Sequence, residues 1–432
     1  MHAACIERGG EIQAAEEGVS LNCEPSLRLK ALWIVLTTLG LGLIFLLLFA
    51  TLEQRPLDME ALRYFPAEML ERGRRFTREA RLAGTLQALA TVGLLLLLCF
   101  SAAGARLLKR LEAIGRGRPS RELACVVVGV GLLSALVEFP FAFYLGYLHE
   151  KAYGLTRISP GAWLGEHLLG LGVSTVLSVL FWLPLYWLIR RSSRHWWLPA
   201  TGVTALFGGL LAMLYPVLLL PLFNQVTPVK DPQVIAMIER MANRAGVEVG
   251  KVREIRVSEK SSRLNAMVTG IGPTKQVVLY NTLYEMMSLA EVEVVLAHEL
   301  AHAVHGDVVT GWVVGSGLGA VSLALAAWLL REMREVAPLN LPAPHAARGL
   351  AVLILFFTLF DTVAAPIQNG VSRQMEVRAD RYALRLTQNP RAVVTSFQKL
   401  AAANPSDVAP PPLVELLSYS HPSILNRIRL AL

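Results

Sequence analysis

Long runs of apolar residues alternate with short polar segments along most of this chain. A helix rises 1.5 Å per residue and the hydrocarbon core of a bilayer is about 30 Å thick, so an apolar run of about twenty residues can span it. The runs lie near residues 31–52, 82–105, 122–148, 162–189, 196–223, 308–330 and 347–368. The pattern therefore predicts a mainly α-helical membrane protein with seven spanning helices.

Two long segments break this pattern. Residues 224–307 separate the first five spans (31–223) from the last two (308–368), and residues 369–432 follow the last span. Since two spanning helices separate these segments, both must lie on the same side of the membrane. We expect them to form one small α+β domain, with residues 1–30 as a polar N-terminal tail.

The insertion at 224–307 shows the signals of short helices and strands. Asp231-Pro232 predicts the start of a helix that runs to about Ala245. A capping box, Ser288-Leu289-Ala290-Glu291, starts another helix ten residues before His298. Three β-like runs lie between them, at 252–258, 265–270 and 276–280.

The second of these β-like runs is a candidate for substrate binding. The stretch that begins with Asn265 and Ala266 alternates in strand fashion. An extended peptide pairs with a strand at the edge of a sheet through main-chain hydrogen bonds. The alternative is that the run forms an internal strand.

Composition agrees with a membrane protein and argues against nucleic-acid binding. The chain is 54% hydrophobic and 17% charged, with a mean hydropathy of +0.47. Its net charge is +8, but the arginines and lysines cluster between apolar runs, where they meet lipid headgroups. Membrane lipids, and not nucleic acid, are the expected partners. The loops 53–81 and 104–121 face opposite sides and hold seven and six Arg and Lys residues, so charge does not fix the orientation.

The motif His298-Glu299-Leu300-Ala301-His302 lies in the helix that the capping box starts. Side chains four residues apart share one face of a helix, so both imidazoles can bind one metal ion while Glu299 faces its open side. This is the pattern of a zinc hydrolase. His305, three residues beyond His302, points partly off that face, and we expect a surface or interfacial role for it.

A catalytic zinc ion usually has three protein ligands and a water. Glu376 is the best third candidate, and Asp380, four residues later, shares its helix face. In this interpretation Glu376 binds zinc and Asp380 accepts the N–H of a ligand imidazole, which fixes the tautomer of the ring. The alternative is that both are solvated acids balanced by nearby arginines.

These residues predict hydrolysis of an amide without a covalent enzyme intermediate. Zinc lowers the pKa of its water and polarises the scissile carbonyl, while Glu299 takes the water proton and passes it to the leaving amine. A developing oxyanion needs a donor opposite the base, and His421 and Arg427 are the candidates near the C-terminus. An equally weighted alternative makes His421-Pro422 structural.

Several further motifs occur in the order found in one family. From about Phe139 onward, the chain resembles the integral-membrane CAAX prenyl protease type 1 enzymes, gluzincin zinc metalloendopeptidases with seven spans. The likeness rests on Pro140-Phe141, Glu150, Tyr153-Gly154, Pro221-Leu222-Phe223-Asn224, Thr227-Pro228, Ser262-Arg263-Leu264-Asn265-Ala266, the stretch 295–302, the stretch 372–380, and His421-Pro422 with Arg427.

The resemblance implies one zinc ion per chain, held by His298, His302 and Glu376, with Glu299 as the base. It also implies that Asp380 supports a ligand, that His421 and Arg427 lie near the substrate, and that the seven helices enclose a large water-filled chamber. The catalytic site would face the cytoplasm, from the inner membrane of a bacterium or the endoplasmic reticulum of a eukaryote. The substrates implied are peptides or membrane-associated proteins, with or without a lipid.

Two other functions remain as alternatives. A membrane quality-control protease of the HtpX type shares the zinc motif, but seven spans and the motifs between Phe139 and Gly154 favour the first family. A non-catalytic membrane chaperone or transporter with structural zinc is the other. Glu299 argues against it, because a structural site has no use for a base beside an open coordination position.

Overall fold

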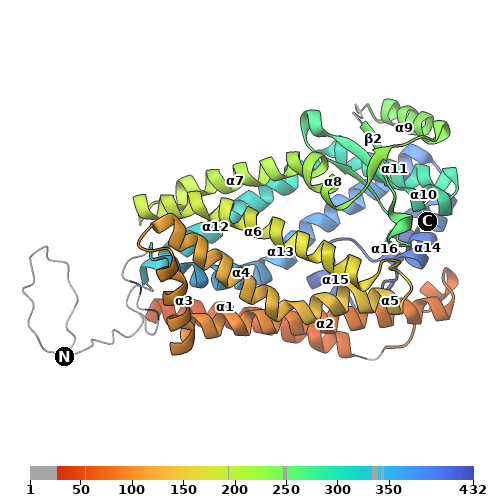
Figure 1. Cartoon of the computed structure of the whole chain (residues 1–432). Coiled ribbons are helices and arrows are strands. Elements are labelled where there is room, and N and C mark those ends of the chain that lie inside the picture. The colour runs from red at the N-terminus through yellow and green to blue at the C-terminus, as the bar shows by residue number, and fades with distance from the viewer. Residues whose placement is uncertain are drawn as a thin grey trace, which may run out of the picture.

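Seven long apolar helices dominate the computed structural model (Figure 1), which describes residues 27–53, 55–192, 194–246, 251–332, 339, 341 and 345–432. Each of the seven packs against the next, and the last packs against the first, so that they form a closed ring. The seventh span also packs against the second and third, and their side chains share one apolar core. The spans are built on α1 (Leu27–Leu52), α2 (Ala67–Phe100), α4 (Pro119–Phe143), α6 (Pro160–Arg191), α7 (Trp197–Leu214), α12 (Asp307–Glu332) and α13 (Leu350–Thr387).

Short helices extend or connect these spans. The third span continues through a π-helical turn and the fifth does the same, so both reach further than their α-helices alone. The extensions are η2 (Tyr144–His149) with α5 (Glu150–Ala152), and η3 (Tyr215–Leu219) with α8 (Leu220–Phe223); the connecting helices are η1 (Ala61–Arg63), α3 (Ala102–Ile114) and η7 (Ala347–Gly349).

The second span differs from its predicted range of 82–105. Its helix begins at Ala67 and ends at Phe100, because the Ser101 side chain accepts the N–H of Gly104 and starts α3. The arginines of the predicted loop 53–81 therefore lie largely on a helix. They also contact protein: Arg72 donates to the carbonyl of Tyr153 at 2.6 Å.

The seventh span and the segment after it form one continuous helix. The predicted boundary at 368/369 falls inside α13, which runs unbroken to Thr387. Its N-terminal half is part of the ring and its C-terminal half carries Glu376 and Asp380 into the domain outside it. Residues 1–26 of the predicted tail 1–30 lie outside the described residues. Helix α1 begins at Leu27, within the last part of that predicted tail.

The insertion forms a four-stranded sheet in the order β1-β2-β4-β3. Strands β2 and β4 are parallel, and the two outer pairs are antiparallel. Three strands correspond to the predicted runs, whereas β1, three residues long and ending in Pro228, has too short a pattern to be predicted. The strands are β1 (Val226–Pro228), β2 (Lys251–Ile255), β3 (Ala266–Thr269) and β4 (Gln276–Tyr280).

Helices from the insertion and from the C-terminal segment cover this sheet. The helix with the His-Glu-x-x-His motif, α11 (Leu289–His305), packs against α13 and buries Leu296 and Leu300 with Leu279 of β4. Full burial of such a side chain contributes about 1.5–3 kcal/mol. The insertion and the C-terminal segment thus share one core at one end of the ring (Figure 1), as predicted. The other elements are α9 (Pro232–Ala245), η4 (Val257–Glu259), η5 (Gly272–Thr274), α10 (Asn281–Met286), α14 (Pro390–Ala403), α15 (Pro412–Ser418) and α16 (Ile424–Ala431).

Candidate metal centre

Helix α11 holds the two histidines of the motif on one face. Ser288 and Glu291 form the predicted capping box at its start, and Gly306, with φ of 66°, ends it in the left-handed conformation. Within this helix the Nε2 atoms of His298 and His302 lie 3.2 Å apart. Both rings therefore present one nitrogen to the same point.

Helix α13 brings a carboxylate to that point. Oε2 of Glu376 lies 3.1 Å from Nε2 of His298, and Oε1 lies 3.5 Å from Nε2 of His302. Among the described residues, these three form the one group of His, Cys, Asp or Glu side chains close enough to share a metal ion.

The spacing and chemistry of this group fit a zinc ion. Ligand atoms about 2.0–2.1 Å from zinc in a tetrahedron are separated by about 3.3 Å, close to the separations here. Apart from its 3.1 Å approach to Nε2 of His298, the buried Oε2 of Glu376 has no hydrogen-bond partner within the described part of the protein, as expected of a metal ligand. Burial alone would lower the pKa of His298, but hydrogen bonds to Asp380 and Glu376 raise it to about 9, so this site favours a positive charge.

A carboxylate lies behind each ligand imidazole. Oδ1 of Asp380 is 2.9 Å from Nδ1 of His298, the contact predicted from the sequence. Oδ2 of Asp307 is 2.8 Å from Nδ1 of His302. Such contacts hold the ring in the tautomer that leaves Nε2 free for the metal.

The contact of Asp307 was not predicted. The residue lies five positions after His302, past the glycine that ends α11, so helix periodicity does not place it on the ligand face. It is the first residue of α12, and it also pairs with Arg378 of α13. The sequence feature that could have indicated this role is the acidic residue directly after Gly306, the glycine that ends α11.

We expect Asp307→Ala to lower zinc affinity about 10–100-fold, because His302 loses the acceptor that orients it. Asp307→Asn should retain part of the affinity, since its amide oxygen can still accept the imidazole N–H. Competition with a fluorescent chelator measures the affinity. His305→Gln is the matched control: Nδ1 of His305 lies 3.0 Å from the carbonyl of Ala301 and its ring packs on Tyr382, outside the group of three. Wild-type affinity in Asp307→Ala would contradict the assignment.

Arg427 is held by Asp380. Its guanidinium contacts both Asp380 oxygens, at 2.8 and 2.6 Å, and lies 4.5 Å from the centroid of the Phe397 ring. It also reaches Oε2 of Glu376 at 3.7 Å, and its side chain is 14% exposed. The contact with Asp380 was not predicted, and the role of Arg427 as a donor to the oxyanion stays a prediction.

His421 lies on the open side of the site. Its Nε2 is 3.2 Å from Oε1 of Glu376, and its side chain is 54% exposed. The Oγ of Ser420 contacts the other ring nitrogen at 2.8 Å. The imidazole is therefore both close to Glu376 and accessible from outside.

Glu299 is beside the three ligand candidates and outside their group. One of its carboxylate oxygens accepts the N–H of Val268 in β3 at 3.3 Å. Burial raises the pKa of the carboxyl, against the opposing effect of His298 and His302.

Strand β3 lies at the edge of the sheet, so the alternative prediction of an internal strand is wrong. The N–H of Tyr280 donates to the carbonyl of Asn265, so the peptide N–H groups of Ala266 and Val268 point away from β4. That of Ala266 contacts the Asn265 side chain, at 3.0 Å, and that of Val268 contacts Glu299. The free edge of the sheet thus faces the candidate site.

Comparison with known proteins gives matches to two adjoining family models. One, described as peptidase family M48, matches residues 228–432. The other, described as the CAAX prenyl protease N-terminal region with five membrane helices, matches residues 53–225. Together they cover six of the seven spans, the insertion and the C-terminal segment, and the first span lies outside both matches.

Individual proteins give the same pattern. The metalloprotease YhfN of Bacillus subtilis, described as uncharacterized, is 33% identical over 69% of this chain and 71% of its own length. CAAX prenyl protease 1 of Saccharomyces cerevisiae is 25% identical over 70% of each chain. An HtpX protease homologue of Acaryochloris marina is 31% identical, but over 47% of this chain and 72% of its own. The crystal structure of Ste24p from S. mikatae matches the fold with a TM-score of 0.80 at 20% identity, over 94% of this chain and 99% of that one.

Proposed function

Since this chain belongs to peptidase family M48, as a membrane-embedded metalloendopeptidase similar to CAAX prenyl protease 1, we propose that it cleaves peptide bonds at one zinc ion held by His298, His302 and Glu376. The observation that carries the proposal is the separation of 3.1–3.5 Å between Nε2 of each histidine and the nearer Glu376 oxygen. Zinc bound there would polarise the scissile carbonyl and make a water molecule more acidic.

Glu299 is the general base in this proposal. Its carboxylate is buried near both ligand imidazoles and is not one of the three ligands. It takes a proton from the attacking water and delivers it to the nitrogen of the leaving amine, so the peptide bond breaks without a covalent enzyme intermediate. Its contact with Val268 is the one hydrogen bond found for it within the described residues, so the other oxygen is available to the water.

The surrounding charged residues have different roles. Asp380 and Asp307 fix the ligand rings, and Arg427 fixes Asp380 through a two-point contact, so these are positioning residues. His421 is more accessible than Arg427, which supports it as the donor to the developing oxyanion.

The edge of β3 is the proposed substrate-binding strand. An extended peptide that pairs with it would use the N–H of Ala266 and would lie beside Glu299. The side-chain oxygen of Asn265, which now accepts that N–H, would turn to the substrate.

We expect Ala266→Pro to lower kcat/KM about fivefold to tenfold and to leave the zinc content unchanged. Proline removes one outward-facing N–H, and one hydrogen bond is worth about 0.5–1.5 kcal/mol. The bonds between β3 and β4 do not involve this N–H, so the sheet should persist. Ala266→Ser, which keeps the N–H, is the control. Equal kcat/KM for both variants would exclude pairing at Ala266.

The proposed substrates are peptides or membrane-associated proteins, lipidated or unmodified, and the proposed orientation places the site in the cytoplasm. The support is the match of residues 53–225 to the CAAX prenyl protease N-terminal model and the similarity to CAAX prenyl protease 1 over 70% of the chain. The HtpX alternative is weaker, because that match covers less than half of the chain.

Incubation of the purified full-length protein with matched prenylated and unprenylated peptides, followed by mass spectrometry of the products, tests the proposal. We expect cleavage of at least one set, loss of cleavage after zinc chelation, and recovery when zinc is restored. The ratio of the two rates gives the lipid preference. A folded, zinc-loaded protein that cleaves neither set would refute the proposal.

A further inference from the structure

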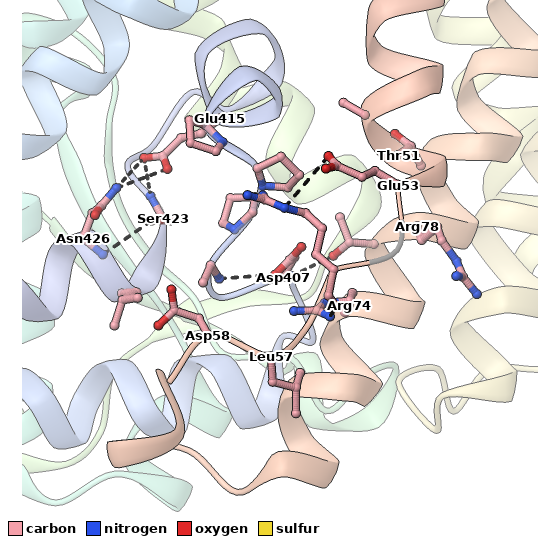
Figure 2. A pocket seen from close by; sticks show the side chains of 18 of the residues that line it. Thr51, Glu53, Leu57, Asp58, Arg74, Arg78, Asp407, Glu415, Ser423 and Asn426 are labelled. Atoms are coloured by element: carbon pink, nitrogen blue, oxygen red, sulfur yellow. Dashed lines mark hydrogen bonds and ion pairs between the residues drawn. The ribbon is translucent and has the colours of Figure 1, made fainter. Parts of the chain in front are cut away.

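A cavity of about 570 Å³ lies between the end of α1, the start of α2 and the C-terminal segment (Figure 2). It adjoins the zinc centre without being part of it: Asn426 of α16 lines the cavity, whereas Arg427, the next residue, contacts Asp380. Its volume is within the range of about 300–1,000 Å³ typical of small-molecule sites.

Many of the charged side chains around this cavity already form ion pairs or hydrogen bonds with other residues of the protein. Arg429 pairs with Glu60 at 2.6 Å, and Arg74 donates to the main-chain carbonyl of Arg55, also at 2.6 Å. Glu415 accepts hydrogen bonds from the Asn426 side chain (Figure 2). These groups shape the walls.

Two arginines of α2 keep donors that the protein does not use. Arg78 is exposed and makes no hydrogen bond or ion pair with any described residue. Arg81 donates a hydrogen bond of 3.3 Å to the hydroxyl of Thr51 and also interacts with the Tyr419 side chain, which leaves some of its five N–H groups free. Both residues line the cavity, three positions apart on α2, and guanidinium groups with free donors bind phosphate.

One carboxylate at the cavity makes no direct ion pair. Asp407 accepts the N–H of Ala409 at 3.2 Å, and no ion pair joins it to a lysine or arginine of the described chain. Burial raises the pKa of this carboxyl, against the opposing effects of Arg74, Arg81 and Arg55. A ligand that carries an ammonium group as well as a phosphate would supply a direct ion-pair partner.

The position of the cavity points to a lipid. Its rim includes Ala50 and Thr51, at the last turn of the first span. On the outer face of the same helix, the side chains of Phe45 and Phe49 are 67% and 65% exposed and lie one turn apart. The cavity therefore lies at the end of a span whose outer face meets acyl chains, which is the membrane depth of lipid headgroups.

We propose that this cavity binds the headgroup of an aminophospholipid, such as phosphatidylethanolamine. Arg78 and Arg81 hold the phosphate, and Asp407 accepts the ammonium. A purely anionic headgroup would leave Asp407 without a partner and would be repelled by it, and a choline headgroup cannot donate a hydrogen bond to it.

The test is lipid binding to the purified full-length protein in detergent, measured by native mass spectrometry and by the shift in Tm. The probes are phosphatidylethanolamine, phosphatidylcholine, phosphatidylglycerol and inorganic phosphate. Arg81→Gln and Asp407→Asn each remove one contact. Arg78→Gln is a second phosphate variant, in a side chain that makes no protein contact in the described structure and so should fold normally. Arg75→Gln, on the same helix but not lining the cavity, is the matched control.

We expect one phosphatidylethanolamine per chain, at least tenfold weaker binding in Arg81→Gln, Arg78→Gln and Asp407→Asn, and wild-type binding in Arg75→Gln. The other two lipids should bind at least tenfold more weakly, and phosphate alone should leave Tm unchanged. Unaltered binding in both arginine variants would overturn the site. An equal response to inorganic phosphate would identify a free-phosphate site, and equal binding of phosphatidylglycerol would remove the role of Asp407; either result overturns the proposal as stated.

Discussion

Glu299→Gln should lower kcat about 10²–10⁴-fold while the protein keeps its zinc, because the amide cannot take a proton from water. This corresponds to about 2.7–5.5 kcal/mol of lost transition-state stabilisation. The amide has almost the same shape as the carboxylate, and Glu299 is not one of the three ligand candidates. Peptide cleavage and zinc content, measured on the same preparation, separate catalysis from metal binding.

Glu293→Gln is the matched control for this substitution. Glu293 lies on the same helix, six residues earlier, and has no hydrogen bond or ion pair in the described structure. It should retain wild-type zinc content and activity. Substantial cleavage by Glu299→Gln, or loss of zinc from it, would remove Glu299 from the role of base.

Glu376→Gln should have the opposite signature and lose zinc together with activity. A neutral amide oxygen is a weaker ligand than a carboxylate, and the substitution leaves only two imidazoles as strong ligands, so we expect zinc affinity to fall about 10²-fold or more. The measurement is zinc per chain after dialysis against a chelator, followed by cleavage in the presence of added zinc. High zinc should restore part of the activity, since Glu299 is intact.

Asp361→Asn controls for damage to α13, because Asp361 lies on the same helix, four turns before Glu376, and is exposed. It should keep its zinc, and all variants should be compared for Tm. If Glu376→Gln binds zinc as tightly as the wild type, the third ligand must be a different residue.

The catalytic helix could be predicted from local rules because all its determinants are close in sequence. The capping box sets where α11 begins, Gly306 sets where it ends, and a period of 3.6 residues places His298 and His302 together. The seven spans could also be predicted from local sequence, since the length of an apolar run has only to match the thickness of the membrane. The ends of the spans were harder to predict, because α2 extends into a polar arginine-rich segment that hydropathy assigns to a loop.

The contacts between distant segments needed the tertiary structure. The sequence nominates Glu376 and Asp380 as a pair on one helix face, but only the packing of α11 against α13 brings them within 3.1 Å and 2.9 Å of His298. The sequence nominated Arg427 as a donor near the substrate, and only the fold shows that its guanidinium contacts both oxygens of Asp380. Asp307 was missed because a left-handed glycine interrupts the helix before it.

The sequence by itself thus determined the membrane class, the helix with the His-Glu-x-x-His motif and the residue types of the candidate metal centre. These depend on periodicity and hydrophobicity, which act over a few turns of helix. The tertiary structure decided which carboxylate supports which imidazole, that β3 is an edge strand, and that a polar cavity lies at the end of α1. Those features depend on how separate elements pack, and that packing is set by the whole core and not by any local pattern.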